Sequence, residues 1–276
     1  MYPLSRRLII FRYFFINYFR SRSFYFLLFL VLIISSLMTY ASLMYFGSIG
    51  RYIVGGSGVA QLLRGNLLEY FWGFFAPTVG FFAALFFGSS AIAGELEEGT
   101  ANFTFTLPVD RRHVFAGKFL AAYAGASIIS AIYYLAGFIS YLVVIRSLPN
   151  LAVLLSYGLL LVFVLAMLSV VFLLSAVFRR TTYVNIAVLV LYFIMFNSLT
   201  LIWEILYRSA PEFLINNTVS VVYTVYVGIS FQFTGLGGTL QPSGFWPVVH
   251  SILIMLCYAI GTVVPAALLF EWRESS

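Results

Sequence analysis

Charged residues are scarce in this chain. Only 9% of its 276 residues are Asp, Glu, Lys or Arg, whereas a soluble domain of this size carries about a quarter. So few charges cannot cover a surface that faces water, so most of the surface must face lipid. A nucleic-acid-binding protein is also excluded, because no soluble segment is long enough to present a contiguous basic face.

Cysteine and histidine are nearly absent. The single cysteine, Cys257, excludes an intramolecular disulfide. The two histidines, His113 and His250, fall on opposite sides of the membrane in the topology given below, so we expect no metal site. No cluster of polar groups suited to catalysis lies near either interface. This disfavours a membrane-embedded enzyme and gives no catalytic residue.

The chain also lacks a phosphate-binding loop. The nearest match runs from Gly94 to Gly99-Thr100, but no lysine follows the second glycine. Its interior, Glu-Leu-Glu-Glu, would repel phosphate. We therefore expect no cofactor in this chain, and any ATP and magnesium would bind to a partner subunit.

Charges are missing from the interiors of the apolar runs. Glu69, Glu204 and Glu271 lie at the predicted edges of these runs. An ion-coupled secondary transporter usually carries ionisable residues along its pathway. That class is therefore an alternative rather than the main interpretation.

Long apolar runs are abundant, and 62% of the residues are hydrophobic. A bilayer core needs roughly 20 apolar residues in a helix, and the runs are continuous rather than alternating, which favours helices over a barrel. The sequence predicts an all-α integral membrane protein, a single transmembrane domain over 1–276. Its six spans are expected at about 24–46, 70–93, 119–145, 151–178, 183–203 and 248–270.

A further apolar segment, Val219 to Phe233, is too short to be an ordinary span. It contains Thr224, Ser230 and Gln232, so we expect a re-entrant or interfacial piece before the sixth span. A seventh span is the alternative, and it would place the C-terminus outside.

The basic residues predict the orientation. Eleven of the 15 Lys and Arg residues fall on the side of the N-terminus, and four fall on the other side. The positive-inside rule therefore places both termini in the cytoplasm of a multi-pass protein of the cell membrane.

The N-terminal segment 1–23 mixes arginines with large apolar residues. The apolar run that follows it is too long for a signal peptide, and no clear cleavage site ends it. Such a segment is typical of an elbow helix that lies in the lipid headgroup region. A basic flank with no further role is the other interpretation.

The segment 94–118 is the one polar stretch between predicted spans on the cytoplasmic side. Gly99 ends the helix that continues the second span, and Pro108 stops any helix before it. Asp110 can cap a new helix that leads into the third span. From these residues alone, a docking site and an ordinary solvated loop are both open.

The same segment carries a recognisable pattern. Glu95-x-x-Glu98-Gly99-Thr100 is followed by Leu107-Pro108-Val109-x-Arg111 and then by Gly117-Lys118. This pattern, over roughly 25 residues, resembles the signature of permease subunits of type 2 ATP-binding-cassette (ABC) exporters. The six-span arrangement with both termini inside extends the similarity to the whole chain.

The resemblance implies a cytoplasmic coupling helix between spans two and three that docks on a separate nucleotide-binding ATPase subunit. It also implies a dimer of permeases, either two copies or two paralogues. Two neighbouring charges, Glu97 and Arg112, are added to the residues that match the pattern. The expected docking residues are Glu95, Glu97, Glu98, Gly99, Thr100, Pro108, Arg111, Arg112 and Lys118.

The expected cargo is an exported amphiphilic or lipid-like molecule, because the span interiors are apolar and aromatic. Polar groups on the fifth span are candidates for its pathway, although hydrogen bonds between helices of the bundle are the simpler explanation for each. These candidates are Tyr183, Asn185, Tyr192 and Asn197. A non-transporting assembly or sensor subunit in the membrane is the main rival function.

Overall fold

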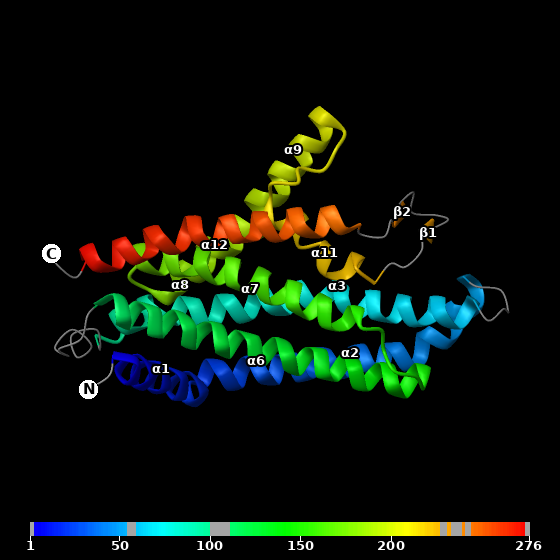
Figure 1. Ribbon diagram of the computed structural model, residues 1–276, viewed down its shortest axis with the longest axis horizontal. Helices are drawn as coiled ribbons and strands as arrows, with labels where there is room; N and C mark the ends of the chain where they lie inside the picture. Colours follow the sequence, from blue (N-terminus) through cyan, green and yellow to red (C-terminus); the bar gives the residue numbers. More distant parts are fainter. Residues whose placement is uncertain are drawn as a thin grey trace.

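The computed structural model describes the chain except for residues 1–2, 54–58, 100–110, 227–230, 233–238, 241–243 and 274–276. Its described part is a bundle of long helices that run roughly side by side (Figure 1). Both termini lie at one end of the bundle, called here the terminal end, and the opposite end is called the far end.

In the described part of the chain, six helices are long and apolar enough to cross a membrane, which confirms the predicted number of spans. The stretches with this character are Ser23–Met44, Gly65–Glu97, Arg111–Ile145, Ala152–Val177, Thr181–Tyr207 and Phe245–Trp272. They belong to α2 (Arg22–Ile53), α3 (Val59–Ser89) with its extension, α6 (Arg111–Ile145), α7 (Ala152–Val177), α8 (Thr181–Leu189) with its extension, and α12 (Phe245–Arg273).

The second and fourth spans form the centre of the bundle. In their most apolar stretches 72% and 67% of the residues are buried, against 11% for the fifth span and 17% for the sixth. Glycines on α3 let α7 approach closely, since a Cβ at Gly80 would lie 2.9 Å from Val164 and one at Gly88 would lie 2.7 Å from Val171. The outer spans therefore expose apolar faces that suit lipid or another chain.

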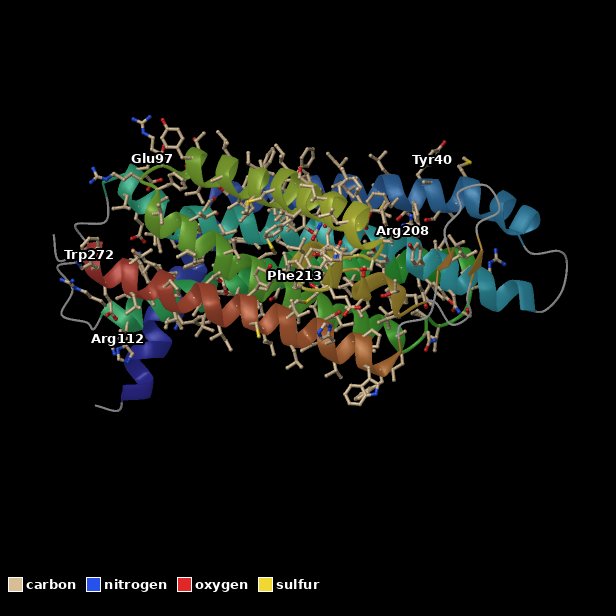
Figure 2. The ribbon with its side chains drawn as sticks, turned by 90° about the horizontal axis from the view of Figure 1, so that it is seen from above. Tyr40, Glu97, Arg112, Arg208, Phe213 and Trp272 are labelled. Atoms are coloured by element: carbon tan, nitrogen blue, oxygen red, sulfur yellow. The ribbon has the colours of Figure 1, made fainter. Side chains whose placement is uncertain are left out.

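The expected elbow helix is present as α1 (Pro3–Arg20). A single residue, Ser21, separates it from α2, and the Ser21 hydroxyl accepts a hydrogen bond from the Phe24 amide at 3.2 Å. This is the bond that an N-cap serine makes. Phe14 packs with Val114 and Ala121 of α6. Figure 2 shows α1 turned away from the long axis of the bundle.

The second span ends in an irregular turn. A π-helix, η1 (Ser90–Gly94), follows α3 and leads into α4 (Glu95–Glu97). Ser175 of α7 compensates for the disturbed helical bonds, because its Oγ accepts from the Ala93 amide at 2.9 Å and donates to the Ser89 carbonyl at 3.2 Å. The wider turn thus carries the helix on into the acidic residues of α4.

The fifth span is bent. A second π-helix, η2 (Val190–Phe196), joins α8 to α9 (Asn197–Tyr207), and π-turns are a known cause of kinks. Figure 1 shows α9 leaving the bundle. Arg208, whose φ is 53°, ends α9 in the left-handed conformation.

The described residues between α9 and α12 contain no seventh span. They form two short helices, α10 (Ile215–Thr218) and α11 (Val221–Thr224), and an antiparallel pair of two-residue strands, β1 (Phe231–Gln232) and β2 (Thr239–Leu240). Both helices are buried in part, with Ile215 and Val222 at 0% exposure. The two short helices therefore pack into the bundle without crossing it.

Candidate functional site

The predicted docking residues that the structure describes gather at the terminal end. Figure 2 shows Glu97 and Arg112 at this end, together with Trp272 near the C-terminus. Thr100, Pro108 and the expected coupling helix lie outside the described residues, within the gap 100–110. The site is therefore built from the helix ends on either side of that gap.

The acidic side of the site follows from the end of the second span. Glu97 is exposed, and its Oε2 accepts hydrogen bonds from the Thr181 amide at 3.0 Å and from the Thr181 hydroxyl at 2.7 Å. Glu97 thereby caps the first turn of α8. Gly99 has a φ of 70°, a left-handed conformation that favours glycine and ends a helix.

Lys118 is the buried member of the set. Its side chain is 1% exposed, and its Nζ lies 2.5 Å from Glu95 Oε2. The same ammonium lies 5.4 Å from the ring centres of Phe14 and Phe270. A buried ammonium requires such partners, because desolvation otherwise penalises its charge. Lys118 therefore ties together α1, α4, α6 and α12, and it does not lie on the surface.

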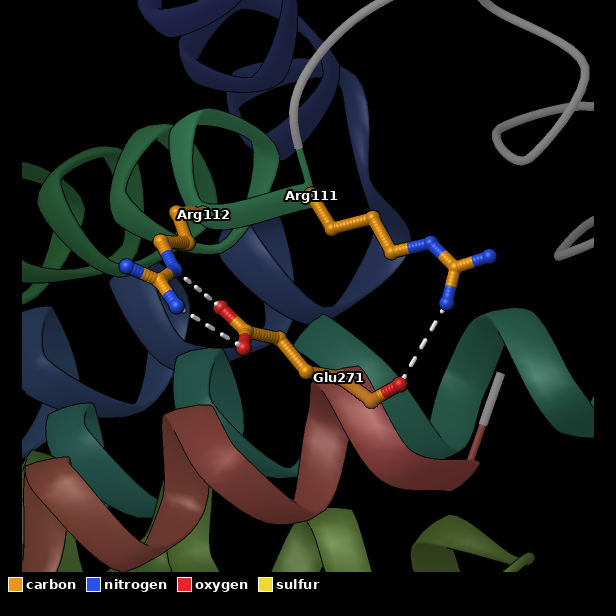
Figure 3. A network of polar contacts seen from close by, with 3 residues as sticks. All are labelled: Arg111, Arg112 and Glu271. Carbon is orange, nitrogen blue, oxygen red and sulfur yellow. Dashed lines mark hydrogen bonds and ion pairs between the residues drawn. The ribbon is translucent and has the colours of Figure 1, made fainter. Parts of the chain in front are cut away.

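Two arginines at the start of α6 contact the end of the last helix (Figure 3). Arg112 Nε donates to Glu271 Oε1 at 2.7 Å, and Arg111 Nη1 donates to the Glu271 carbonyl at 3.3 Å. The Arg112 side chain is 81% exposed, so water screens this ion pair. No sequence pattern predicts that Glu271 pairs with these arginines, because it lies 159 positions from Arg112.

The arrangement divides the predicted docking set into two groups. Glu95 and Lys118 form an internal ion pair that holds the helix ends together. Glu97, Glu98, Gly99, Arg111 and Arg112 are exposed at the same end. These exposed residues place two carboxylates and two guanidinium groups where a soluble partner can reach them.

The four pathway candidates on the fifth span do not share one surface that could line a transport pathway. Tyr183 is exposed, while Tyr192 stacks on Phe81 of α3 with ring centres 4.4 Å apart. Asn197 donates to the Phe193 carbonyl at 2.8 Å and accepts from Asn216 at 3.2 Å. Asn185 has a buried Oδ1 with no hydrogen-bond partner among the described residues. Only Asn185 thus retains an unused buried polar group.

Sequence reasoning missed one buried acid. The sequence predicts Glu69 at the edge of the second span, but α3 begins at Val59 and Glu69 is only 6% exposed. No sequence pattern predicts this burial. The residues before Glu69 include the polar Gln61, Arg64 and Asn66, so hydropathy does not show that the helix already begins at Val59.

A comparison with protein-family models gives one match. The family is described as ABC-2 family transporter protein, and the match covers residues 8–273. The comparison with curated proteins gave no match. The family match includes both sides of the terminal-end site and all six spans.

Proposed function

The chain belongs to the ABC-2 family of transporters, and on this premise we propose that it is the permease subunit of an ATP-driven exporter. The family's membrane domains are not catalytic, and ATP is hydrolysed on a separate subunit. The observation that carries the proposal is the family match over 8–273, together with six helices able to span a membrane.

The ATPase subunit docks at the terminal end in this proposal. Exposed Glu97, Glu98, Arg111 and Arg112 lie on both sides of the segment 100–110, and they offer charges of both signs to a soluble partner. Movement of the docked subunit would act directly on the second and third spans, since α4 and α6 continue into them. The terminal end then faces the cytoplasm, with ATP and magnesium on the partner.

A second permease, either a copy or a paralogue, completes the pathway in this proposal. The fifth and sixth spans are the least buried, so one chain leaves broad apolar faces uncovered. Lipid and the second permease share these faces. The cargo is an amphiphilic or lipid-like molecule, because apolar and aromatic groups dominate the described surface of the spans.

The decisive experiment is affinity purification of this chain from its native membranes in mild detergent, with mass spectrometry of the chains that accompany it. We expect a stoichiometric soluble chain with a phosphate-binding loop, lost when Glu98 and Arg111 are substituted. A chain that purifies with a membrane partner and no ATPase would instead support the assembly or sensor function.

The cargo class has its own test. Efflux of labelled compounds from proteoliposomes that contain the permease and its ATPase should favour amphiphiles over small hydrophilic ions. Transport of only a small hydrophilic ion would contradict the proposed cargo.

A further inference from the structure

A small cavity lies inside the bundle, away from the terminal-end site. Its volume is about 30 Å³, and its lining comes from α3, α6 and the start of α7, together with Tyr226 beyond α11. Aromatic side chains dominate its walls: Trp72, Tyr133, Tyr134, Phe138, Tyr141 and Tyr226. The faces of such rings attract cations.

Glu69 lines the same cavity, and one of its two carboxylate oxygens lacks a hydrogen-bond partner among the described residues. Its Oε1 accepts a hydrogen bond from the Asn150 amide at 2.9 Å, but its Oε2 has no partner among the described residues. Trp72 Nε1 is likewise buried without a described partner. A buried carboxylate is costly unless a donor or a positive charge meets it. The cavity thus combines an acid that has one unpartnered oxygen with aromatic side chains.

The walls of the cavity are held in place by hydrogen bonds. Tyr133 donates to the Trp72 carbonyl at 2.9 Å, and the hydroxyls of Tyr134 and Ser156 lie 2.8 Å apart. Gly137 leaves the space that the Trp72 ring occupies, because a Cβ there would lie 2.9 Å from the ring. The site is therefore preorganised, which lowers the entropic cost of binding.

We propose that this cavity binds a primary ammonium group. Glu69 Oε2 would accept a hydrogen bond from the ammonium, and the ring faces would surround its positive charge. One water needs about 10–15 Å³ of such space, so the cavity admits about two heavy atoms. That is the size of a CH₂–NH₃⁺ end, and a trimethylammonium group is too large.

Two sources offer this group: the ethanolamine head of a membrane lipid, and a free amphiphilic amine. The Pro149–Asn150 turn at the cavity joins two spans at the far end, where lipid headgroups lie. The inference does not depend on ATP-driven transport, because it concerns equilibrium binding.

The test uses the full chain in nanodiscs of phosphatidylcholine and phosphatidylglycerol. Binding of dodecylammonium and dodecyltrimethylammonium is measured, and retention of phosphatidylethanolamine is counted in parallel by mass spectrometry. We expect the primary amine to bind at least about tenfold more tightly than its trimethyl analogue, since only the former can make the charge-assisted hydrogen bond. Similar affinities for the two amines would overturn the proposal without any variant.

Variants then locate the site. Glu69→Gln keeps the acceptor for the Asn150 amide and removes the charge, and it should weaken dodecylammonium binding about tenfold or more. Gly137→Ala keeps the charge, but its Cβ would displace the Trp72 ring that lines the cavity, so it should weaken binding as well. Glu204→Gln, at an exposed carboxylate on α9, is the matched control and should bind like the wild type.

Unchanged binding in both Glu69→Gln and Gly137→Ala would refute the site. If the protein retains phosphatidylethanolamine and dodecylammonium displaces it, the site binds a lipid head. If the protein binds dodecylammonium but retains no phosphatidylethanolamine, the site binds a free amphiphilic amine. Both of the last two outcomes support the proposed chemistry.

Discussion

The Lys118 ammonium is 1% exposed, with the Glu95 carboxylate at 2.5 Å and two aromatic rings near it. Arg112 makes an ion pair of similar length with Glu271, but its side chain is 81% exposed. The two pairs lie at the same end of the bundle and differ mainly in burial. Because water screens only the exposed pair, their contributions to stability should differ strongly.

Replacing Glu95 by Gln should therefore destabilise the protein markedly. The buried ammonium loses its counterion, and we expect the free energy of unfolding to fall by about 3 kcal/mol. Thermal unfolding of the purified protein in detergent measures this change. The double variant Glu95→Gln with Lys118→Met should recover much of the loss, because no buried charge remains. The exposed control Arg112→Gln should cost less than about 1 kcal/mol.

At the scale of the element, the end of the second span depends on a hydroxyl from the fourth. Ser175 Oγ both accepts from the Ala93 amide and donates to the Ser89 carbonyl at the π-turn η1. Ser169 lies on the same helix, but its hydroxyl donates only to the Leu165 carbonyl of its own helix. Ser175 therefore supplies hydrogen bonds to the backbone of another helix, whereas Ser169 does not.

Substitution Ser175→Ala should lower the free energy of unfolding by about 1–3 kcal/mol, because it leaves the buried Ala93 amide without its acceptor. Ser169→Ala is the matched control and should change stability by a few tenths of that amount. Melting temperatures of the two variants in the same detergent give the comparison. Equal effects would mean that the π-turn does not need Ser175.

At the scale of the whole molecule, the two ends of the bundle carry different chemistry. The terminal end presents Glu98 beside the segment 100–110, while Glu212 lies away from that end, between α9 and α10, with its carboxylate 3.4 Å from His250 Nδ1. If the ATPase docks at the terminal end, as proposed, Glu98 should matter for transport and Glu212 should not. The proposed docking also predicts that the terminal end faces the cytoplasm.

Charge reversal of Glu98 to Lys should reduce ATPase binding and coupled transport about tenfold. The positive charge of the lysine would repel an ATPase surface that is complementary to the negative charge of Glu98. The variant should fold normally, since Glu98 is exposed. Glu212→Lys makes the same charge change away from the terminal end and should leave ATPase binding unaltered. Co-purification and transport by proteoliposomes test both variants. A normal Glu98→Lys permease would contradict docking on this segment.

Accessibility to thiol reagents tests the orientation. In a Cys257→Ser background, a cysteine at Glu98 should react with a membrane-impermeant reagent only from the cytoplasmic side, and one at Glu212 only from the opposite side. Both sites are exposed in the structure. Labelling of both from the same side would invalidate the proposed topology.

Sequence patterns predicted the spans better than the site. Six spans follow from composition, since each run is long and apolar in its own right. The ends were less predictable, and α6 begins at Arg111 although its apolar run starts near 119. The roles within the docking set were not predictable either. Lys118 and Arg112 look alike in sequence, and only the packing of α1 and α12 buries one of them.

The sequence by itself determined that this is a six-span membrane protein, and the polar pattern at 94–118 pointed to its family. Both follow from local properties, hydropathy and short-range motifs, which need no partner in space. Tertiary structure alone decided that Glu95 pairs with Lys118, that Arg112 meets Glu271, and that Glu69 is buried beside an aromatic cavity. Such contacts join distant segments, and burial depends on which helices pack together.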